Sequence, residues 1–260
     1  MVENEYYREV TKLRKTIEVW DEMFTCEVAE DERMQAWIRL EVMGDSLVNK
    51  YAWAVPDSRA INILKTFSPL IEIGAGIGYW SKLLLESDVD IISFDSAPPA
   101  KEEAWAPVQK GDPKVLKKSS SKGRNLFLCY PDEGEGMALE CLENFTGEYI
   151  IHVGELINSG TLSLPQSAWG RTSAPDFQVK LNAEFHCVLN AQLSASFPFS
   201  RDCISVWKRT EFVRGKGGGE EEEEEEEVGV EDEKGDAWAC IPLEERIPVD
   251  RAAPLYQHLI

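Results

Sequence analysis

The sequence lacks the patterns that mark several common classes of protein. Its six cysteines form no CxxC pair and share no metal-ligand spacing with the three histidines, which argues against a zinc site and against a disulfide framework. No run approaches the ~20 apolar residues that a membrane span requires, and the charged N-terminus has no apolar core of a signal peptide. We therefore expect reduced, mostly buried thiols and a cytoplasmic protein without a metal site.

Basic charge is also scarce, with 27 Lys and Arg against 47 Asp and Glu. The excess is concentrated near the end, where residues 220–260 hold fifteen acids and three bases and include the unbroken run Glu220–Glu227. An acidic field repels phosphate backbones and anionic membranes, so we expect neither nucleic acid nor a membrane as partner. The like charges predict a disordered tail over residues 213–260, either as a solubilising appendage or as a binding site for a basic protein.

The stretch from Leu70 to Asp95, LIEIGAGIGYWSKLLLESDVDIISFD, predicts a strand, a tight turn, a helix and a second strand. Glycines at positions 74, 76 and 78 permit backbone conformations that a side chain would forbid, and the helix directs free N–H groups toward the turn. This pattern predicts a cradle for a nucleotide-type cofactor. It has no Walker lysine, and Tyr79 occupies the third glycine position of a dinucleotide turn, which argues against NAD.

Apolar periodicity predicts a helical extension over residues 1–50 and an α/β domain over residues 51–212. The extension carries two helical stripes and either covers the core or forms a lid or a dimer contact. Strands alternating with helices then predict a three-layer, doubly wound and mostly parallel sheet, closed by an antiparallel strand pair. The two stripes consist of Tyr6, Val10, Leu13, Ile17, Trp20 and Phe24, and of Trp37, Leu40, Met43 and Leu47.

The segment EIGAGIGYW, together with the FD that ends the next strand, resembles the first motif of class I S-adenosylmethionine-dependent methyltransferases. The resemblance extends through YAWAVP upstream and through GDPKVL, LFLCYP and YIIHVGE downstream, so it covers residues 51–210. It is strongest to a branch with an LFLCWPP-like fourth strand and a VGE after the fifth. The resemblance implies a Rossmann-like sheet of seven strands with an antiparallel last strand, and S-adenosyl-L-methionine as cofactor.

The resemblance also implies which residues hold that cofactor. Asp95 would accept hydrogen bonds from both ribose hydroxyls, which suits a carboxylate because it is acceptor-only when ionised. Asp112 of GDP would meet the adenine amino group, and Glu72 would support the methionine end through contacts of the turn. The glycines Gly74, Gly76 and Gly78 would lie against the cofactor. Independently of the resemblance, the helix expected just ahead of the first strand is placed to close over the cofactor, so we expect Tyr51 and Trp53 to touch it. The alternatives are turn residues at strand ends for the two aspartates and plain core for Trp53.

The acceptor of such enzymes usually lies at the end of the fourth strand, here CYPD at residues 129–132. We expect Tyr130 to stack on an acceptor and Asp132 to orient or deprotonate it; an ordinary loop is the alternative. The segment loosely resembles an NPPY-type loop of amine-methylating enzymes, but it lacks the first polar residue and the second proline. Glu155, just past the fifth strand, is the third catalytic candidate, whereas His152 within YIIHV is expected to be a core residue.

Two functions of different classes follow from these observations. The first is S-adenosylmethionine-dependent methyl transfer, which needs an aligned nucleophile and few obligatory side chains. The second is a non-catalytic binding module of the same fold, with an acidic tail that recruits a basic protein. A nucleotide-dependent oxidoreductase is a third, weaker hypothesis, and the sequence names neither the acceptor nor the oligomeric state.

Overall fold

The computed structural model describes residues 4–23, 25, 27–132, 134, 136–156 and 172–210. Within this part of the chain, helices and strands alternate from β1 to β5, as the sequence predicts. The helices are α1 (Glu5–Thr16), α2 (Glu30–Lys50), α3 (Ser58–Thr66), α4 (Tyr79–Leu85), α5 (Met137–Asn144) and α6 (Pro175–Glu184), with 3-10 turns η1 (Pro113–Lys117) and η2 (Ser119–Ser121). The strands are β1 (Leu70–Ile73), β2 (Ile91–Asp95), β3 (Gln109–Lys110), β4 (Asn125–Cys129), β5 (Tyr149–Gly154), β6 (Phe185–Gln192) and β7 (Cys203–Arg209).

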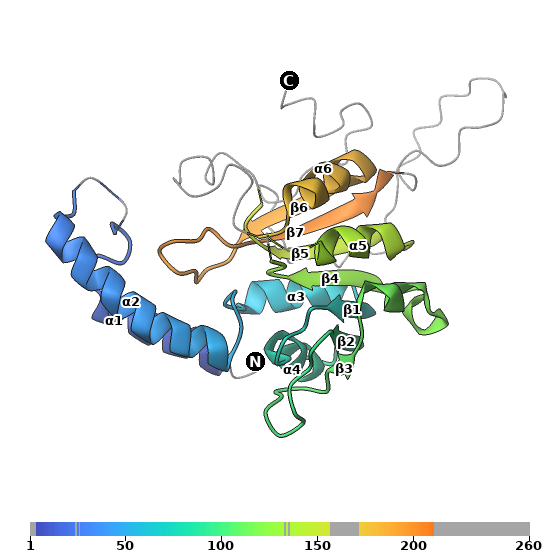
Figure 1. The fold of residues 1–260 in the computed structure, drawn as a ribbon, viewed down its shortest axis with the longest axis horizontal. Helices are drawn as coiled ribbons and strands as arrows, with labels where there is room; N and C mark the ends of the chain where they lie inside the picture. Colours follow the sequence, from blue (N-terminus) through green and yellow to red (C-terminus); the bar gives the residue numbers. More distant parts are fainter. Residues whose placement is uncertain are drawn as a thin grey trace.

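The seven strands form one sheet in the order β3-β2-β1-β4-β5-β7-β6 (Figure 1). Strands β1 to β5 are parallel to one another, whereas β7 is antiparallel to both β5 and β6. The predicted antiparallel pair is confirmed, and the structure adds that β7 lies inside, between β5 and the edge strand β6. Because the chain leaves β1 toward β2 and later returns to β4 on the other side, the switch point lies between β1 and β4.

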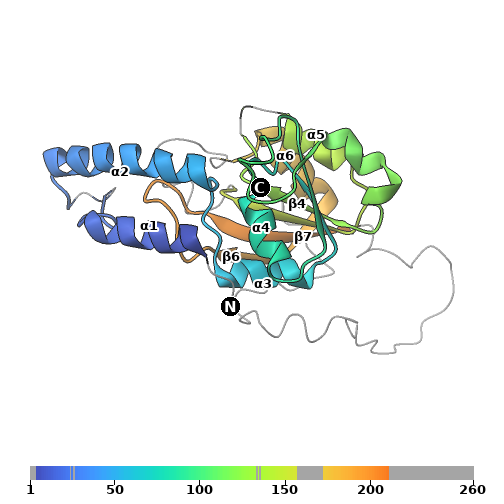
Figure 2. The same cartoon turned by 90° about the horizontal axis from the view of Figure 1, so that it is seen from below.

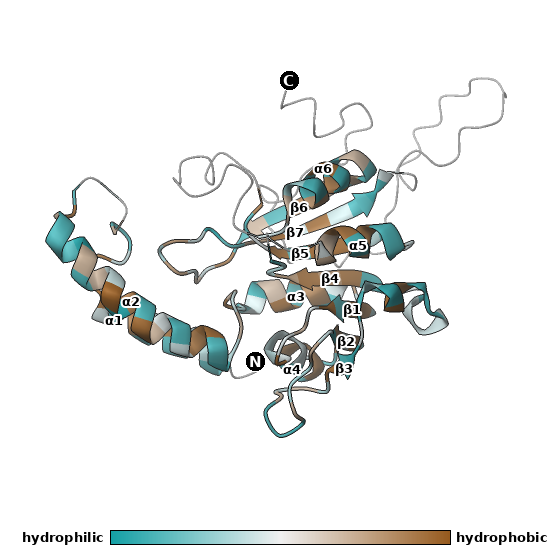
Figure 3. Ribbon diagram, viewed as in Figure 1, coloured by the Kyte–Doolittle hydropathy of each residue, from teal (hydrophilic) through white to brown (hydrophobic). Residues whose placement is uncertain are grey.

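Helices cover both faces of the sheet, which confirms the predicted three layers (Figure 2). Apolar side chains of α3 and α4 share one cluster with Leu70, Phe127 and Ile151 on one face of the sheet. Helices α1 and α2 project beyond the strand ends (Figures 1 and 2), and buried side chains of α1 join the same cluster. On the other face, α5, α6 and η1 pack against alternate residues such as Ile71 and Leu126. The carboxyl-terminal part of β4 is accordingly brown in Figure 3, and all residues of β5 are buried, as expected for strands that are covered on both faces.

The N-terminal helices belong to the same core as the sheet. Tyr6, Val10 and Leu13 of α1 are buried within the cluster that contains β1 and β4. The stripe predicted for the second helix is partly wrong, because Met43 is 47% exposed while Gly44 is buried. Gly44 faces the Phe197 ring of the β6–β7 connection, where a small residue permits close packing. The predicted stripe residue Phe24 lies outside the described residues.

Local sequence signals explain how individual elements begin. The Asp57 carboxylate accepts a hydrogen bond from the Ala60 N–H at 2.7 Å and caps α3.

The described cysteines have free thiols: Cys129, Cys141, Cys187 and Cys203. The remaining two cysteines and the tail predicted over residues 213–260 lie outside the described residues. None of the described helices combines the length and the apolar composition that crossing a membrane would require.

Candidate functional site

The tight turn predicted between β1 and α4 is present, and its glycines have a left-handed backbone. The φ angle is +78° at Gly74, +54° at Gly76 and +80° at Gly78, a region that residues with a Cβ rarely occupy. The N–H groups of Gly74 and Ala75 donate to the Phe94 carbonyl at 2.9 and 3.1 Å and so tie the turn to β2. The path of the chain at the carboxyl end of β1 therefore depends on glycine.

Asp95, the last residue of β2, lies directly beside this turn. Its Oδ2 accepts a hydrogen bond from the Gly76 N–H at 2.9 Å, and its Oδ1 accepts one from the Ala97 N–H at 2.9 Å. Each carboxylate oxygen has a second lone pair, so the group can accept two further donors. A Cβ placed on Gly76 would meet no described atom within 4 Å. The partly exposed Asp95 and the outer side of Gly76 therefore border the same open space near the switch point.

Glu72 on β1 is 2% exposed and points toward α4 rather than out of the turn. The Ser81 hydroxyl donates to its Oε2, and Ser81 in turn shares a hydrogen bond with Ser93 of β2. Burial raises the pKa of Glu72 to about 7, against the opposing effect of the two serine hydrogen bonds. The carboxyl group thus joins β1, β2 and α4 beneath the turn, and its predicted support of the methionine end of a cofactor stays a prediction.

Asp112 lies two residues beyond β3, at the same edge of the sheet as Asp95. Its Oδ1 accepts a hydrogen bond from the Lys114 N–H at 2.9 Å and caps η1. The preceding Gly111 N–H donates to the Asp95 carbonyl at 2.9 Å, which fixes the two aspartates relative to each other. The turn role that was the alternative for Asp112 is therefore present. Asp112 is exposed, and its Oδ2 is not used in this cap. Contact of this oxygen with an adenine amino group stays a prediction.

Two aromatic residues singled out in the sequence contact each other. The rings of Trp53 and Tyr130 are stacked, with centroids 5.7 Å apart and planes inclined by 14°. Trp53 is 57% exposed, so one side of this pair faces outward. Tyr130 has φ of +53° and its N–H donates to the Val153 carbonyl at 2.7 Å, which places it at the carboxyl end of β4 in a conformation that is uncommon for a bulky residue. Such conformations are concentrated at functional sites.

Asp132 and Glu155 are connected through Thr172. Asp132 forms an isolated antiparallel bridge with Thr172, and its Oδ1 accepts from the Gly134 N–H at 2.6 Å. The Thr172 hydroxyl accepts from the Glu155 N–H at 3.0 Å and donates to the Glu155 carbonyl at 2.8 Å. Glu155 is fully buried and its Oε1 accepts from the Arg201 N–H at 3.3 Å, whereas Asp132 is exposed. The structure thus brings the two acids to one edge of the sheet, at different depths.

His152 and Cys129 are unsuited to base or nucleophile chemistry. Burial lowers the pKa of His152 to about 3, and its Nε2 is 3.0 Å from the Ser173 hydroxyl. The imidazole is therefore neutral and part of the core, as the sequence indicated. Burial also raises the pKa of the Cys129 thiol well above its usual value, with smaller contributions from the charges of Glu72 and Asp202. A thiolate nucleophile at this position is disfavoured.

Asp202 is a buried acid of this edge that was not identified from the sequence. It is 1% exposed, its Oδ2 accepts from the Ser200 hydroxyl at 3.0 Å, and it directly precedes β7. Because β7 is antiparallel to β5, Cys203 pairs with Gly154, so the start of β7 lies beside the end of β5 and beside Glu155. The predicted antiparallel strand was the signal that would have placed Asp202 here.

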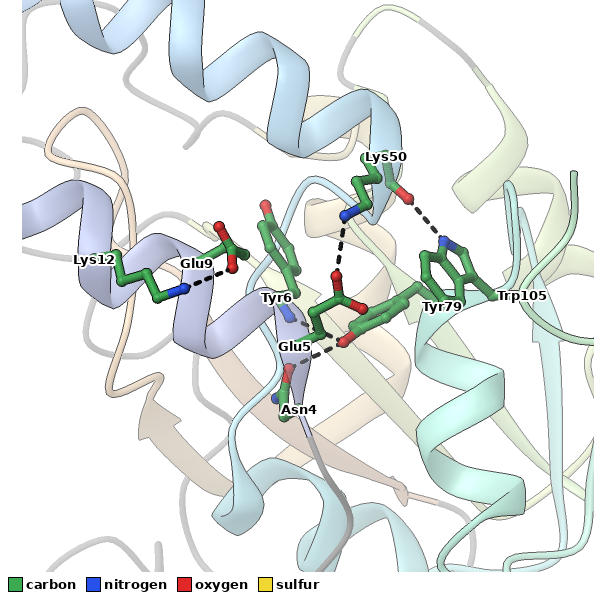
Figure 4. Close-up of polar contacts among 8 residues, drawn as sticks. All are labelled: Asn4, Glu5, Tyr6, Glu9, Lys12, Lys50, Tyr79 and Trp105. Carbon is green, nitrogen blue, oxygen red and sulfur yellow. Dashed lines mark hydrogen bonds and ion pairs between the residues drawn. The ribbon is translucent and has the colours of Figure 1, made fainter.

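The N-terminus is attached to the helix that follows the glycine turn (Figure 4). The Tyr79 hydroxyl accepts a hydrogen bond from the Tyr6 N–H at 3.1 Å and donates one to the Asn4 Oδ1 at 3.2 Å. Tyr79 directly follows Gly78 and is buried. These bonds therefore fix the first turn of α1 against the end of the glycine turn.

Tyr51 contributes to the same contact from the end of α2. Its ring stacks on Tyr6 on one side, with centroids 4.7 Å apart, and on Trp105 at 5.6 Å. The Trp105 Nε1–H donates to the Lys50 carbonyl at 2.7 Å (Figure 4). Tyr51 is 1% exposed, so it belongs to the core. The aromatic cluster covers one flank of the turn and is built from four separate segments of the chain.

The chain is similar in structure to several solved proteins, methyltransferases among them. A glycopeptide N-methyltransferase complexed with S-adenosyl-L-homocysteine matches at 12% identity over 67% of this chain and 97% of its own, with a TM-score of 0.41. Human N-acetylserotonin methyltransferase in complex with S-adenosylmethionine matches at 14% identity over 78% and 66%, with a TM-score of 0.41. TehB from Haemophilus influenzae matches at 12% identity over 64% and 66%, with a TM-score of 0.38. No protein-family model and no curated protein matches the chain.

The strand order identifies the fold, and these distant likenesses are not needed for it. The resemblance to class I methyltransferases implied seven strands with an antiparallel last strand, and the structure has both, in the order 3-2-1-4-5-7-6. The chain has the class I methyltransferase fold. In this fold the glycine turn, Asp95 and the carboxyl ends of β4 and β5 all lie at one edge of the sheet, where open α/β sheets bind their ligands.

Proposed function

We propose that this protein transfers a methyl group from S-adenosyl-L-methionine to an acceptor that is still to be identified. The observation that carries the proposal is the pairing of Asp95 with the left-handed Gly76 beside the switch point of a methyltransferase fold. The pair leaves two acceptor lone pairs and an open space above the turn. A ribose with two adjacent hydroxyls fits this arrangement of acceptors.

The chain's own residues have distinct tasks in this proposal. Asp95 accepts hydrogen bonds from the ribose hydroxyls, Asp112 contacts the base, and the turn lets the backbone approach the cofactor closely. S-adenosylmethionine supplies an electrophilic methyl group on a sulfonium. Tyr130 and Trp53 provide an aromatic surface at the end of β4 on which an acceptor can be oriented, and orientation supplies most of the rate in such a transfer. Asp132 is exposed and able to receive a proton from the acceptor.

The proposal is tested by calorimetric titration with S-adenosylmethionine. The wild-type chain is expected to bind, and Asp95→Asn is expected to bind about 10- to 100-fold more weakly, because a hydrogen bond to a charged group contributes about 1.5–3 kcal/mol. Asp45→Asn, an exposed change on α2, serves as the matched control and should bind as the wild type does. Absence of binding by the wild type, or equal binding by Asp95→Asn, would contradict the cofactor assignment.

A non-catalytic binding module is the second candidate. It is favoured by the acceptor side, where Glu155 is fully buried and Asp132 already accepts a hydrogen bond within its own loop. Incubation of the protein with a labelled methyl donor and a cell extract separates the two functions. A methyltransferase labels an acceptor and releases S-adenosylhomocysteine, whereas a module that binds the cofactor without chemistry does neither.

A further inference from the structure

The overall acidity of the chain conceals a local basic surface. Residues 110–124 contain six Lys and Arg and one Asp, a net charge of +5 in a chain whose net charge is −20. Five lysines of this segment are exposed, and we call them the basic strip: Lys110, Lys114, Lys117, Lys118 and Lys122. The strip begins at β3 and ends just before β4, and Figure 3 colours most of this turn as hydrophilic.

The fold itself directs these lysines outward. Pro113, Val115 and Leu116 of η1 are buried, and η1 packs against α5, so Lys114 and Lys117 are the residues of this 3-10 turn that face solvent. Arg124 is paired with Asp90 at 2.8 Å, whereas the five strip lysines make no ion pair with any described residue. The strip is therefore a surface of positive charge without ion pairs in the described part of the chain. The cap at Asp112 and the buried Val115 and Leu116 fix its backbone.

The chain carries a segment of the opposite charge that can reach this surface. Eight consecutive glutamates, Glu220–Glu227, follow β7 after a connection of residues 211–219 that includes four glycines. Nine residues span at most about 30 Å when fully extended. The acidic run is thus placed by its covalent link within a limited distance of the end of β7.

The antiparallel direction of β7 brings that end close to the strip. Leu126 of β4 is level with Ile150, and the adjacent Tyr149 is level with Lys208 of β7. The end of β7 therefore emerges beside the start of β4, two strands away, which is about 10 Å. Figure 1 shows the end of β7 and the turns before β4 at the same end of the sheet. Both the distance and the direction allow residues 220–227 to reach Lys117, Lys118 and Lys122.

We propose that the acidic run Glu220–Glu227 docks on the basic strip of its own chain. Single exposed ion pairs are weak, but a tethered segment has an effective concentration in the millimolar range, so a network of several pairs suffices for docking. The contact is electrostatic and exposed, and salt therefore weakens it. It does not depend on methyl transfer, since neither surface contains a residue assigned to the acceptor. The partner of the acidic tail is accordingly the domain that carries it.

Binding of a labelled octaglutamate peptide tests the proposal by fluorescence anisotropy. In the full chain the strip is covered, so binding should be weak. Replacement of all eight residues Glu220–Glu227 by Gln should strengthen peptide binding by about tenfold or more at about 50 mM salt, and about 500 mM salt should abolish it. Adding Lys114→Gln, Lys117→Gln, Lys118→Gln and Lys122→Gln should remove the binding. Lys12→Gln, Lys15→Gln, Lys65→Gln and Lys101→Gln form the charge-matched control and should leave it intact.

Zero-length carbodiimide cross-linking of the full chain provides the second readout. Links are expected between residues 220–227 and the strip lysines, and a mixture of unlabelled and nitrogen-15-labelled protein should show that they form within one chain. Circular dichroism shows whether each variant is folded. Links only between chains, equal linking to Lys12 and Lys15, or unchanged peptide binding after removal of the acidic run would overturn the proposal. So would a variant without the run that binds a single-stranded oligonucleotide but not the peptide.

Discussion

Glu72 shows how a single buried carboxyl group couples the candidate site to the pH dependence of stability. Burial raises its pKa from 4.5 to about 7, the charge of Asp95 adds to this effect, and the hydrogen bonds from Ser81 and Ser93 oppose it. The folded chain therefore holds the proton at a pH where the unfolded chain has released it. This contribution to stability is fully present below pH 4.5 and is lost as the pH rises toward about 7.

Glu72→Gln is expected to remove the loss of stability that the Glu72 carboxyl group causes as the pH rises. The difference between the two pKa values corresponds to roughly 3 kcal/mol, so the variant should gain stability relative to wild type on going from pH 5 to pH 8 by an amount of that order. Urea unfolding at both pH values measures it, with the exposed Glu102→Gln as the control. A constant difference between wild type and Glu72→Gln across this range would contradict the assignment.

The pKa of His152 changes stability with pH in the opposite direction to that of Glu72, so the Glu72 effect has to be measured with a variant. Burial lowers its pKa to about 3, so the unfolded chain binds a proton below pH 6.5 that the folded chain does not. Stability therefore falls as the pH drops below 6.5, whereas the Glu72 contribution rises over the same interval. The pH profile of the wild type shows only the sum of the two effects. Comparison with Glu72→Gln isolates one of them.

At the scale of elements, two glycines of the same turn are required for different reasons, Gly78 for packing and Gly76 for its backbone conformation and for the approach of a ligand. A Cβ on Gly78 would approach the Val108 Cγ2 to 2.9 Å and the Ala106 backbone nitrogen to 3.3 Å, whereas Gly76 has open space. Both have positive φ, of +80° and +54°. Gly78 is thus required by packing against the loop that follows β2, and Gly76 by its backbone conformation and by the approach of a ligand.

Gly76→Ala and Gly78→Ala are expected to have different effects. Left-handed backbone costs each alanine about 1–2 kcal/mol, and the clash at Gly78 adds about 1–3 kcal/mol of overpacking. Gly78→Ala should therefore lower the melting temperature more. Gly76→Ala should remain folded and bind S-adenosylmethionine about tenfold more weakly, which corresponds to about 1.4 kcal/mol. Thermal unfolding and calorimetry distinguish them, and wild-type affinity in a folded Gly76→Ala would argue against a ligand at this turn.

At the scale of the whole molecule, the N-terminal helices are part of the domain core rather than an appendage. Tyr6, Val10, Leu13, Ile17 and Trp20 are each at most 5% exposed and pack in one cluster with the sheet. Tyr6 also bonds to Tyr79 beside the glycine turn. The buried side chains of α1 thus contribute to the core, while the lid and dimer roles considered for these helices stay predictions.

Removal of residues 1–28 is expected to prevent cooperative folding. Five buried side chains at roughly 1.5–3 kcal/mol each amount to on the order of 10 kcal/mol, which is comparable to the whole net stability of about 5–15 kcal/mol of a typical protein. Removal of residues 211–260 is the control and should leave a cooperative thermal transition. Differential scanning calorimetry of both truncated chains measures this, and a wild-type-like transition without residues 1–28 would show that the helices are dispensable.

The sequence by itself determined the local elements of this protein. The stretch Leu70 to Asp95 located the first two strands, the helix between them and the glycine turn, with Asp95 at the end of β2. These features depend on backbone sterics and on side-chain periodicity within about ten residues, so they are legible without the fold. The resemblance of EIGAGIGYW and FD to methyltransferases then implied the seven strands and the antiparallel last strand that the structure confirms.

Only the tertiary structure decided which distant residues meet. The Trp53–Tyr130 stack, the Thr172 link between Asp132 and Glu155, and the place of Asp202 all depend on the insertion of β7 and on loop packing. Met43 and Gly44 show the same limit, because apolarity alone predicts burial of the larger residue while close packing selects the smaller one. Such pairings are decided by shape complementarity across many elements, for which a single sequence contains no local signal.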